Sequence, residues 1–237
     1  MKLTYIKHSG FVIEGTLCTI IVDYFKDADD QFIQKSLASF KGPLYVCASH
    51  WHPDHFNPEI LQWKTIRPDT TYLFSDDIRL KKKLPFDTAR FLEKGDVFQD
   101  EFLRMKAFGS TDVGISFLVH LEGKTIFHAG DLNNWHWDEE STPEEIMEAE
   151  QAYLEELRTL SAEINTIDLA LFPVDCRLGK NYQRGAQQFV DTLKVGLFAP
   201  MHFGSKYRQA NAFQSYAEKA GCTFIAWSKT GESLIIP

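Results

Sequence analysis

The stretch His50-Trp51-His52-Pro53-Asp54-His55 places three imidazoles and one carboxylate within six residues. It directly follows Leu44 to Ala48, an apolar run that predicts a buried strand. On an extended segment the side chains at i and i+2 point to the same side, so His50 and His52 can reach one metal ion. Asp54 and His55 then follow in a turn, where they can reach a neighbouring position. With 8 histidines in 237 residues, this pattern arises by chance roughly a few times in ten thousand, so it predicts a metal site.

Further candidate donors stand at the ends of other predicted strands. Asp131 follows the apolar run Ile126 to Ala129 and the turn-forming Gly130, and His202 follows Gly196 to Met201 in the same way. Asp23 ends the apolar run Cys18 to Val22. Taken alone, a capping Asp or a loop His explains each of them. Together with the histidine run they become candidates for the same site.

The order of predicted elements indicates an α/β fold. Strands are expected at Leu3–Lys7, Phe11–Glu14, Cys18–Val22, Leu44–Ala48, Thr71–Phe74, Phe102–Ala107, Ile115–Leu121, Thr125–Ala129, Leu169–Pro173, Gly196–Ala199, Thr223–Trp227 and Ser233–Ile236, and helices at Gln31–Phe40, Asp76–Leu84, Pro143–Leu160, Gly185–Leu193 and Asn211–Ala220. Strand-rich halves with helices between them predict a layered sandwich of sheets covered by helices. No repeat, linker or boundary interrupts the chain, so we expect a single domain spanning residues 1–237.

Composition narrows the class of protein and of partner. A hydrophobic fraction of 44% can fill a core, and a formal charge of −8 opposes nucleic-acid binding, so no nucleic acid is expected as a partner. The four cysteines are widely spaced, which indicates neither a thiolate zinc site nor a disulfide framework. No apolar run reaches membrane-spanning length and no signal peptide is evident, so we expect no membrane and a cytoplasmic location. A small-molecule substrate is the expected partner, and a homo-oligomer is compatible with these features.

In this order of motifs the chain resembles the metallo-β-lactamase-fold hydrolases, over nearly its whole length. Members carry an Asp after an early strand, H-x-H-x-D-H, a further His, an Asp after a later strand and a final His. Asp23, the run from His50 to His55, Asp131 and His202 match that order. The opening Ile6-Lys7-His8-Ser9-Gly10-Phe11-Val12-Ile13 is similar to the branch of L-ascorbate 6-phosphate lactonase-like proteins. The resemblance implies a four-layer αββα sandwich, that is, a metallo-β-lactamase fold.

The resemblance also implies a binuclear site holding two divalent metal ions, zinc or manganese with iron as a further option. His50 and His52 would serve the first position and Asp54, His55 and His202 the second, with Asp131 bridging. Such a pair holds a hydroxide at neutral pH and polarises the bond that it attacks. Asp54 and Asp131 are the expected catalytic carboxylates, with Asp54 orienting the hydroxide or taking its proton. Asp23 would orient a ligand histidine through its other ring nitrogen.

The chain departs from the family pattern at the third histidine. Gly109-Ser110-Thr111-Asp112-Val113-Gly114 occupies the loop where that histidine is expected. Asp112 in its place would make the site richer in oxygen and shift its preference from zinc towards manganese or iron. Alternatively His136 swings in from the loop beyond Asp131, or the first position holds metal weakly or not at all. As a plain turn residue, Asp112 would have no such role.

Several other residues are candidates for the surroundings of the metals. His8, in a turn between two early strands, is expected either to face the metals as a supporting group or proton shuttle, or to lie on the surface. Trp135 and Trp137 could form a wall of a substrate pocket. Arg177 and Lys206 lie in loops that could gather around the site and bind a phosphate or carboxylate, although ordinary surface charges explain them too.

The leading hypothesis is therefore a metal-dependent hydrolase of a small, anionic ester, lactone or phosphoester that uses metal-bound hydroxide. Within the same fold, a nuclease or phosphodiesterase is the alternative, against which the acidic balance speaks. A non-catalytic binding protein with a degenerate metal site is the alternative from another class. Only the missing third histidine favours it.

Overall fold

The computed structural model describes residues 1–237 and contains two sheets of seven strands each. The first sheet has the order β14-β1-β2-β3-β4-β5-β6. Its strands are β1 (Lys2–Lys7), β2 (Gly10–Glu14), β3 (Thr19–Val22), β4 (Leu44–Ala48), β5 (Thr70–Ser75), β6 (Arg90–Leu92) and β14 (Ser233–Ile235). Strands β3, β4, β5 and β6 run parallel to one another, so their carboxyl ends lie at one edge of the sheet.

The second sheet has the order β13-β12-β11-β10-β9-β8-β7. Its strands are β7 (Val97–Gln99), β8 (Leu103–Phe108), β9 (Ser116–Leu121), β10 (Lys124–His128), β11 (Thr166–Pro173), β12 (Lys194–Met201) and β13 (Thr223–Phe224). Strands β10 to β13 are parallel, so the second sheet also has an edge of carboxyl ends. A hairpin turn at Glu122-Gly123 joins β9 to β10, and both residues have positive φ.

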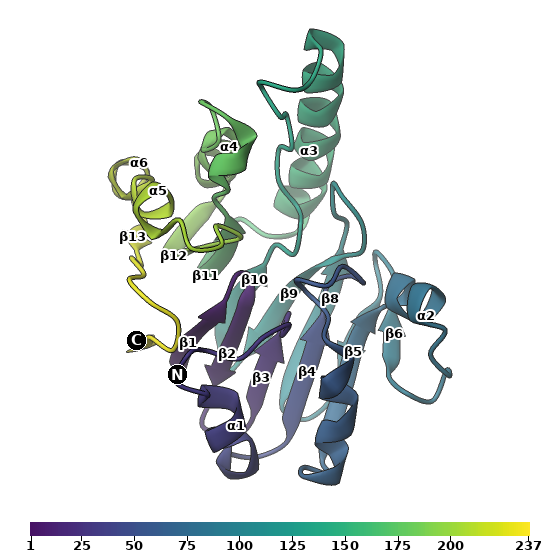
Figure 1. The fold of residues 1–237 in the computed structure, drawn as a ribbon. Coiled ribbons are helices and arrows are strands. Elements are labelled where there is room, and N and C mark those ends of the chain that lie inside the picture. Colours follow the sequence, from purple (N-terminus) through teal and green to yellow (C-terminus); the bar gives the residue numbers. More distant parts are fainter.

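Helices cover the outer faces of both sheets, as Figure 1 shows. They are α1 (Phe32–Ser36), α2 (Asp76–Lys82), α3 (Pro143–Glu163), α4 (Arg184–Thr192), α5 (Tyr207–Asn211) and α6 (Gln214–Lys219), with the 3-10 helices η1 (Leu37–Ser39), η2 (Pro58–Thr65) and η3 (Cys176–Leu178). No helix combines the length and the apolar character needed to cross a bilayer.

Alternation along the strands separates the layers of the core. Neighbouring residues of β3 face opposite ways: Ile20 belongs to the large core between the sheets, whereas Ile21 packs with the helices of the first half. Ile33 of α1 and Ile78 of α2 lie in that smaller outer core. The large core continues through the second sheet to Phe189 of α4. The predicted α/β class and the four-layer αββα sandwich are confirmed.

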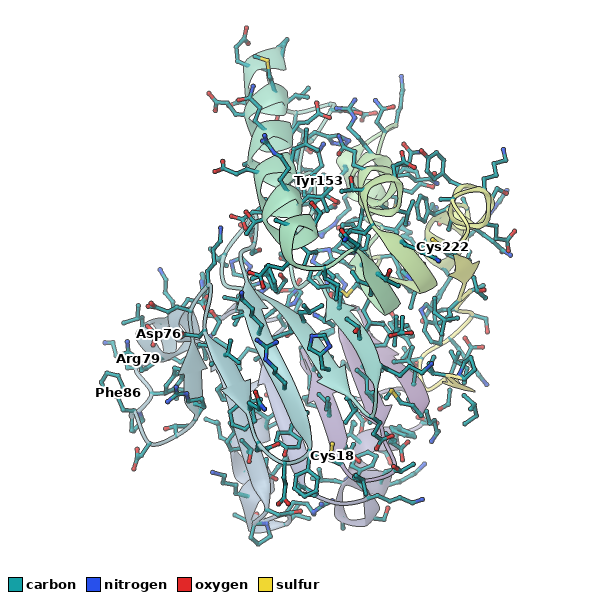
Figure 2. The ribbon with its side chains drawn as sticks, turned by 180° about the vertical axis from the view of Figure 1, so that it is seen from behind. Cys18, Asp76, Arg79, Phe86, Tyr153 and Cys222 are labelled. Atoms are coloured by element: carbon teal, nitrogen blue, oxygen red, sulfur yellow. The ribbon has the colours of Figure 1, made fainter.

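The acidic helix α3 packs one face onto the second sheet and exposes its carboxylates. Thr142 caps it through a capping box with Glu145, as the Thr-Pro start of the helix predicts. Tyr153, Leu157 and Leu160 form the buried face. The hydroxyl of Tyr153, which is labelled in Figure 2, donates to the Gly185 carbonyl at 2.8 Å and so ties α3 to α4.

The carboxyl-terminal region differs from its prediction in two places. The single helix expected over Asn211–Ala220 is divided into α5 and α6, and the strand expected over Thr223–Trp227 ends at Phe224. One side chain accounts for much of this, because the amide of Asn211 bonds both the N–H and the carbonyl of Trp227. The backbone of Trp227 is therefore bonded to the end of α5, and only its indole N–H reaches β12, where it donates to the Pro200 carbonyl at 3.2 Å. The short elements β6, β7 and η2 were not predicted, since none carries a long periodic pattern.

Candidate metal centre

The candidate donors gather where the carboxyl ends of strands from both sheets meet. The run from His50 follows β4, Asp131 follows β10, and His202 follows β12 directly. Each of these strands belongs to a parallel part of its sheet, so the loops after them open on one side of the sandwich. Residues that lie more than 150 positions apart in the chain thereby come into contact at one site.

Two groups of four potential metal donors result. The His50 cluster consists of His50, His52, Asp112 and Asp131, and the His55 cluster consists of His8, Asp54, His55 and His202. Within each group the donor atoms lie within 4.8 Å of one another. Every candidate ligand that the sequence indicates, except His136, belongs to one of the two groups. Asp112 stands where the missing third histidine was expected.

The carboxylate of Asp131 lies between the clusters. Its Oδ2 is 3.3 Å from Nε2 of His50. Its Oδ1 is 3.2 Å from Nε2 of His55 and 3.4 Å from Nε2 of His202. One oxygen thus faces each cluster, which is the geometry that a bridging carboxylate requires.

These inward contacts differ from hydrogen bonds. Hydrogen bonds between a protonated nitrogen and a carboxylate are about 2.7–2.9 Å long, whereas the inward contacts, including His52 Nδ1 to Asp112 Oδ2, measure 3.2–3.4 Å. Atoms bound to one ion at about 2.0–2.1 Å in a tetrahedron lie about 3.4 Å apart. The inward spacing therefore fits the edges of a coordination shell.

The inward atoms also lack partners within the protein. Nε2 of His50, Nε2 of His55 and Oδ1 of Asp131 are buried without a hydrogen bond. Each such atom costs about 1–3 kcal/mol if it stays unsatisfied. Cations placed in the two clusters would satisfy all three, so the residues present fit divalent metals.

The outward nitrogens, in contrast, have short hydrogen bonds. Nδ1 of His55 lies 2.7 Å from Asp23, and Nδ1 of His202 lies 2.9 Å from Asp175. Nδ1 of His50 lies 2.9 Å from the hydroxyl of Ser49. Such contacts fix the orientation of a ligand ring and raise its basicity. Asp23 lies where the sequence analysis expected it, beside a histidine of the run.

Sequence reasoning missed Asp175 and Ser49. Asp175 follows β11 in the way that Asp23 follows β3, so the strand-end rule that found Asp23 could have found it. Ser49 is the first residue after β4, and its hydroxyl also donates to Asp23 at 2.7 Å. Asp23 therefore supports one imidazole of each cluster, His55 directly and His50 through Ser49.

The electrostatics of the site favour a cation. Burial alone would raise the pKa of Asp131, but the imidazoles of His55, His202 and His50 hold the pKa of its carboxyl well below the usual value. Burial likewise acts to lower the pKa of His50, yet the Asp131 carboxylate raises it. The group between the clusters is therefore a carboxylate anion, whose negative charge favours a cation at the site.

Close backbone packing fixes the loop that carries Asp112. Gly114 has φ +76°, and a Cβ there would lie 2.1 Å from the Ser49 carbonyl oxygen and 2.5 Å from Cβ of His50. Only glycine allows this approach. The hydroxyl of Thr111 donates to the carbonyl of Asn133 at 2.6 Å, which joins the loop to the segment after Asp131. The Asp112 loop is thus held against the elements that supply its neighbours in the His50 cluster.

A cavity of about 280 Å³ opens onto both clusters. It is lined by His52, Asp54, Thr111, Asp112, Asp131, Trp135, Trp137, Arg177 and His202. The rings of Trp135 and Trp137 stack at 18°, with 6.2 Å between their centroids, and form the apolar part of the lining. A larger cavity of about 610 Å³ between Tyr24 and Trp63 contains none of the donors, so volume alone does not locate the site.

Arg177 is the cation of this cavity. Its Nε and Nη2 bond Asp175, and its side chain is 59% exposed. Lys206 lies in a neighbouring cavity of about 250 Å³, of which Arg177 forms a shared wall. Of the two predicted cations, only Arg177 therefore reaches the cavity beside the donor clusters.

His136 lies away from both clusters. Its ring is fully buried, and its Nε2 lies 3.0 Å from the carbonyl oxygen of Asn181. The neighbouring Trp135 turns instead towards the site, where its ring contacts His202. Of the two residues considered as replacements for the third histidine, the fold brings Asp112 rather than His136 to His50 and His52.

The sequence matches a family model and several curated relatives. Residues 2–147 match the beta-lactamase superfamily domain. A UPF0173 metal-dependent hydrolase of Desulforamulus reducens is 25% identical over 100% of both chains, and another from Symbiobacterium thermophilum is 22% identical over 98% of this chain and 99% of the relative.

Among solved structures, Igni18, a metallo hydrolase of Ignicoccus hospitalis, superimposes with a TM-score of 0.68 at 19% identity over 98% of this chain and 97% of its own. CmlA, a diiron β-hydroxylase of Streptomyces venezuelae, gives a TM-score of 0.67 at 14% identity, over 98% of this chain and 53% of its own. At these identities the two structures establish the shared fold alone.

Proposed function

This chain belongs to the beta-lactamase superfamily, as a metal-dependent hydrolase, and from that premise we propose that it cleaves a small anionic ester, lactone or phosphoester with two divalent metal ions. The observation that carries the proposal is the convergence of unpartnered buried donor atoms from both clusters on the Asp131 carboxylate. We propose the number of ions, their identity and the class of substrate.

In the proposed centre each cluster holds one ion. The His50 cluster offers His50, His52 and Asp112, and the His55 cluster offers Asp54, His55 and His202. Asp131 is shared between them. Because Asp112 supplies oxygen where the family pattern has an imidazole nitrogen, we expect the His50 cluster to prefer manganese or iron over zinc.

Bound divalent ions would supply Lewis acidity to the scissile bond and lower the pKa of water in the site. The chain's own residues provide the rest. Asp54 borders the cavity, and although burial would raise the pKa of its carboxyl, His8 and His55 hold that pKa below the usual value. Asp54 is therefore ionised at neutral pH and can accept a hydrogen bond from the attacking water, which orients it.

The lining of the cavity supports a small substrate with one anionic group. Its volume of about 280 Å³ is at the lower end for ligand pockets. The stacked indoles of Trp135 and Trp137 offer one apolar wall. Asp175 fixes Arg177 in place and leaves Nη1 without a hydrogen bond in the protein, so this atom can donate to a substrate carboxylate or phosphate.

Matched chromogenic substrates test the anionic part of the proposal. We expect Arg177→Ala to raise KM about tenfold or more for p-nitrophenyl phosphate and bis(p-nitrophenyl) phosphate, because a hydrogen bond to a charged group contributes about 1.5–3 kcal/mol. KM for the neutral p-nitrophenyl acetate should stay unchanged. Lys206→Ala is the matched control, since Lys206 lies outside the cavity, and its effect should be smaller. An unchanged KM for every anionic substrate in Arg177→Ala would contradict the proposal.

A further inference from the structure

His8 occupies a place in the His55 cluster that the family's ligand pattern does not include. It lies in the turn between β1 and β2, far in sequence from the other donors. Its side chain is 11% exposed, and its Nε2 lies 3.2 Å from Oδ2 of Asp54. Its ring centroid is 4.1 Å from that of His202. Like the inward nitrogens of His50 and His55, Nε2 of His8 is buried without a hydrogen-bond partner.

The backbone is built to aim His8 inward. The β1–β2 pairing shifts register between Tyr5 and Lys7, and such an irregularity re-aims the side chains that follow it. His8 itself has φ 57°, an unusual value for a residue other than glycine. Its N–H donates to the hydroxyl of Tyr5 at 3.0 Å, and its carbonyl accepts from the N–H of His202 at 3.1 Å.

Strained backbone of this kind persists only where the surroundings hold it, and it concentrates at functional sites. Asp23 and His202 also have positive φ, of 48° and 62°. Three of the seven positive-φ residues other than glycine therefore belong to this one site. The strain at His8 is part of the construction of the metal centre and not of an ordinary surface turn.

Resting on the two-ion function proposed above, we propose that Nε2 of His8 is a further ligand of the ion held by Asp54, His55, His202 and the shared Asp131. The distance of 3.2 Å to Asp54 lies within the 3.2–3.4 Å range of the inward spacings around Asp131. It exceeds the length of about 2.7–2.9 Å expected if a protonated His8 merely bonded the Asp54 carboxylate. Donors from three loops, those after β1, β4 and β12, then surround one position.

His128 is a buried histidine of the same region that lies outside the coordination shell. It lies at the end of β10, near Asp23. Nε2 of its ring bonds the Ser9 carbonyl at 2.9 Å, and Nδ1 accepts from the N–H of Gly130 at 3.1 Å. Both of its ring nitrogens are satisfied by the protein. His8 has no such partners, although it is buried in the same region.

This assignment makes the two metal positions unequal. With His8 and the shared Asp131, the ion of the His55 cluster has five protein donors, whereas the ion of the His50 cluster has four. Fewer places then remain for water or substrate at the His55 cluster. The exchangeable places are concentrated at the His50 cluster, beside Asp112.

Cobalt(II) substitution of a His8→Cys variant tests the proposal without measuring activity. A thiolate bound to cobalt(II) gives an intense near-ultraviolet charge-transfer band, so residue 8 reports whether it touches the ion. We expect the band in His8→Cys, after subtraction of the cobalt-loaded wild type, which carries four free cysteines of its own. His128→Cys is the matched control and should show no added band. Circular dichroism establishes that each variant is folded.

A second variant covers the case in which His8→Cys does not fold. His8→Ala should bind one of the two cobalt equivalents at least about tenfold more weakly, a loss no smaller than that of an outer hydrogen-bond partner. Two cobalt ions bound as tightly as in the wild type, or a folded His8→Cys with two ions and no added band, would overturn the His8 assignment alone. Failure of the wild type to bind cobalt at all would overturn the two-ion function itself and the assignment with it.

Discussion

The two donor clusters share Asp131 but differ in the groups that form hydrogen bonds with the outward nitrogens of their imidazoles. In the His55 cluster, carboxylates support two rings, because Asp23 bonds His55 and Asp175 bonds His202. In the His50 cluster, the hydroxyl of Ser49 supports His50, and the ring of His52 has no hydrogen bond of this kind. Carboxylate partners make an imidazole a stronger ligand. We therefore expect the His55 cluster to bind its ion more tightly.

Exposure differs between the clusters at one histidine, because His52 is 30% exposed whereas His50, His55 and His202 are buried. The exposed carboxylates are similar, with Asp112 44% and Asp54 43% exposed. The Asp112 loop comes from a single segment between two strands, while the His55 cluster draws its donors from both sheets and the β1–β2 turn. The fold thus builds one position as an anchored site and the other as an accessible one. Variation in the Asp112 loop can change the chemistry without disturbing the anchored position.

The largest effect is expected at the one residue that the clusters share. Asp131→Ala removes a donor from both, so we expect catalytic turnover to fall by more than about 100-fold, beyond the loss typical of an outer partner. At least one metal equivalent should be lost as well. Asp87→Ala, in an exposed loop, is the control. Steady-state kinetics with elemental analysis provide the measurement, and full turnover with two ions in Asp131→Ala would refute a shared carboxylate.

A smaller effect, on metal affinity, should distinguish support of an imidazole by a carboxylate from support by a hydroxyl. Asp175→Asn keeps an acceptor for His202 but removes its charge, so we expect the tighter ion to bind about tenfold more weakly. Ser49→Ala should weaken the other ion by less than that, since a hydroxyl contributes no charge. Competition with a chromogenic chelator measures both affinities. An equal loss of metal affinity in Asp175→Asn and Ser49→Ala would contradict the proposed difference between carboxylate and hydroxyl support.

The smallest effect should come from making the clusters more alike. Asp112→His restores nitrogen at the third-histidine position, and we expect the ratio of zinc to manganese affinity at the weaker site to rise by a few-fold to about tenfold. Asp112→Asn, which keeps an oxygen donor, should not raise it. The ratio is measured by equilibrium dialysis against mixed metals. If Asp112→His left it unchanged, Asp112 would not be part of the coordination shell.

Much of the anchored part of this account could be predicted from the sequence. The run from His50 to His55 follows an apolar strand, and Asp131 and His202 follow others, so strand periodicity marks them as candidates. The family resemblance implies that they meet at one site. The fold class followed from the same alternation. The same rule also applies to Asp175, which follows the strand that ends at Pro173, but the sequence analysis did not identify it.

The remainder depends on geometry that no local pattern carries. The inward aim of His8 results from a register shift in β1 and a backbone bond to His202, which lies almost 200 residues away in sequence. The choice of Asp112 over His136 is decided by the close packing of Gly114 against Ser49. Division of the helix after Asn211 reflects a tertiary bond to Trp227. Each of these is a long-range contact, and local propensity yields to it.

We expect the chain to bind two manganese(II) ions of unequal affinity, and a calorimetric titration measures both affinities. Metal-free protein is titrated with manganese(II) in a calorimeter, and the bound metal is counted by elemental analysis. We expect two equivalents of bound manganese in separate phases, with the weaker phase lost in Asp112→Ala and the tighter phase lost in His55→Ala. A single equivalent at saturation in the wild type would contradict it.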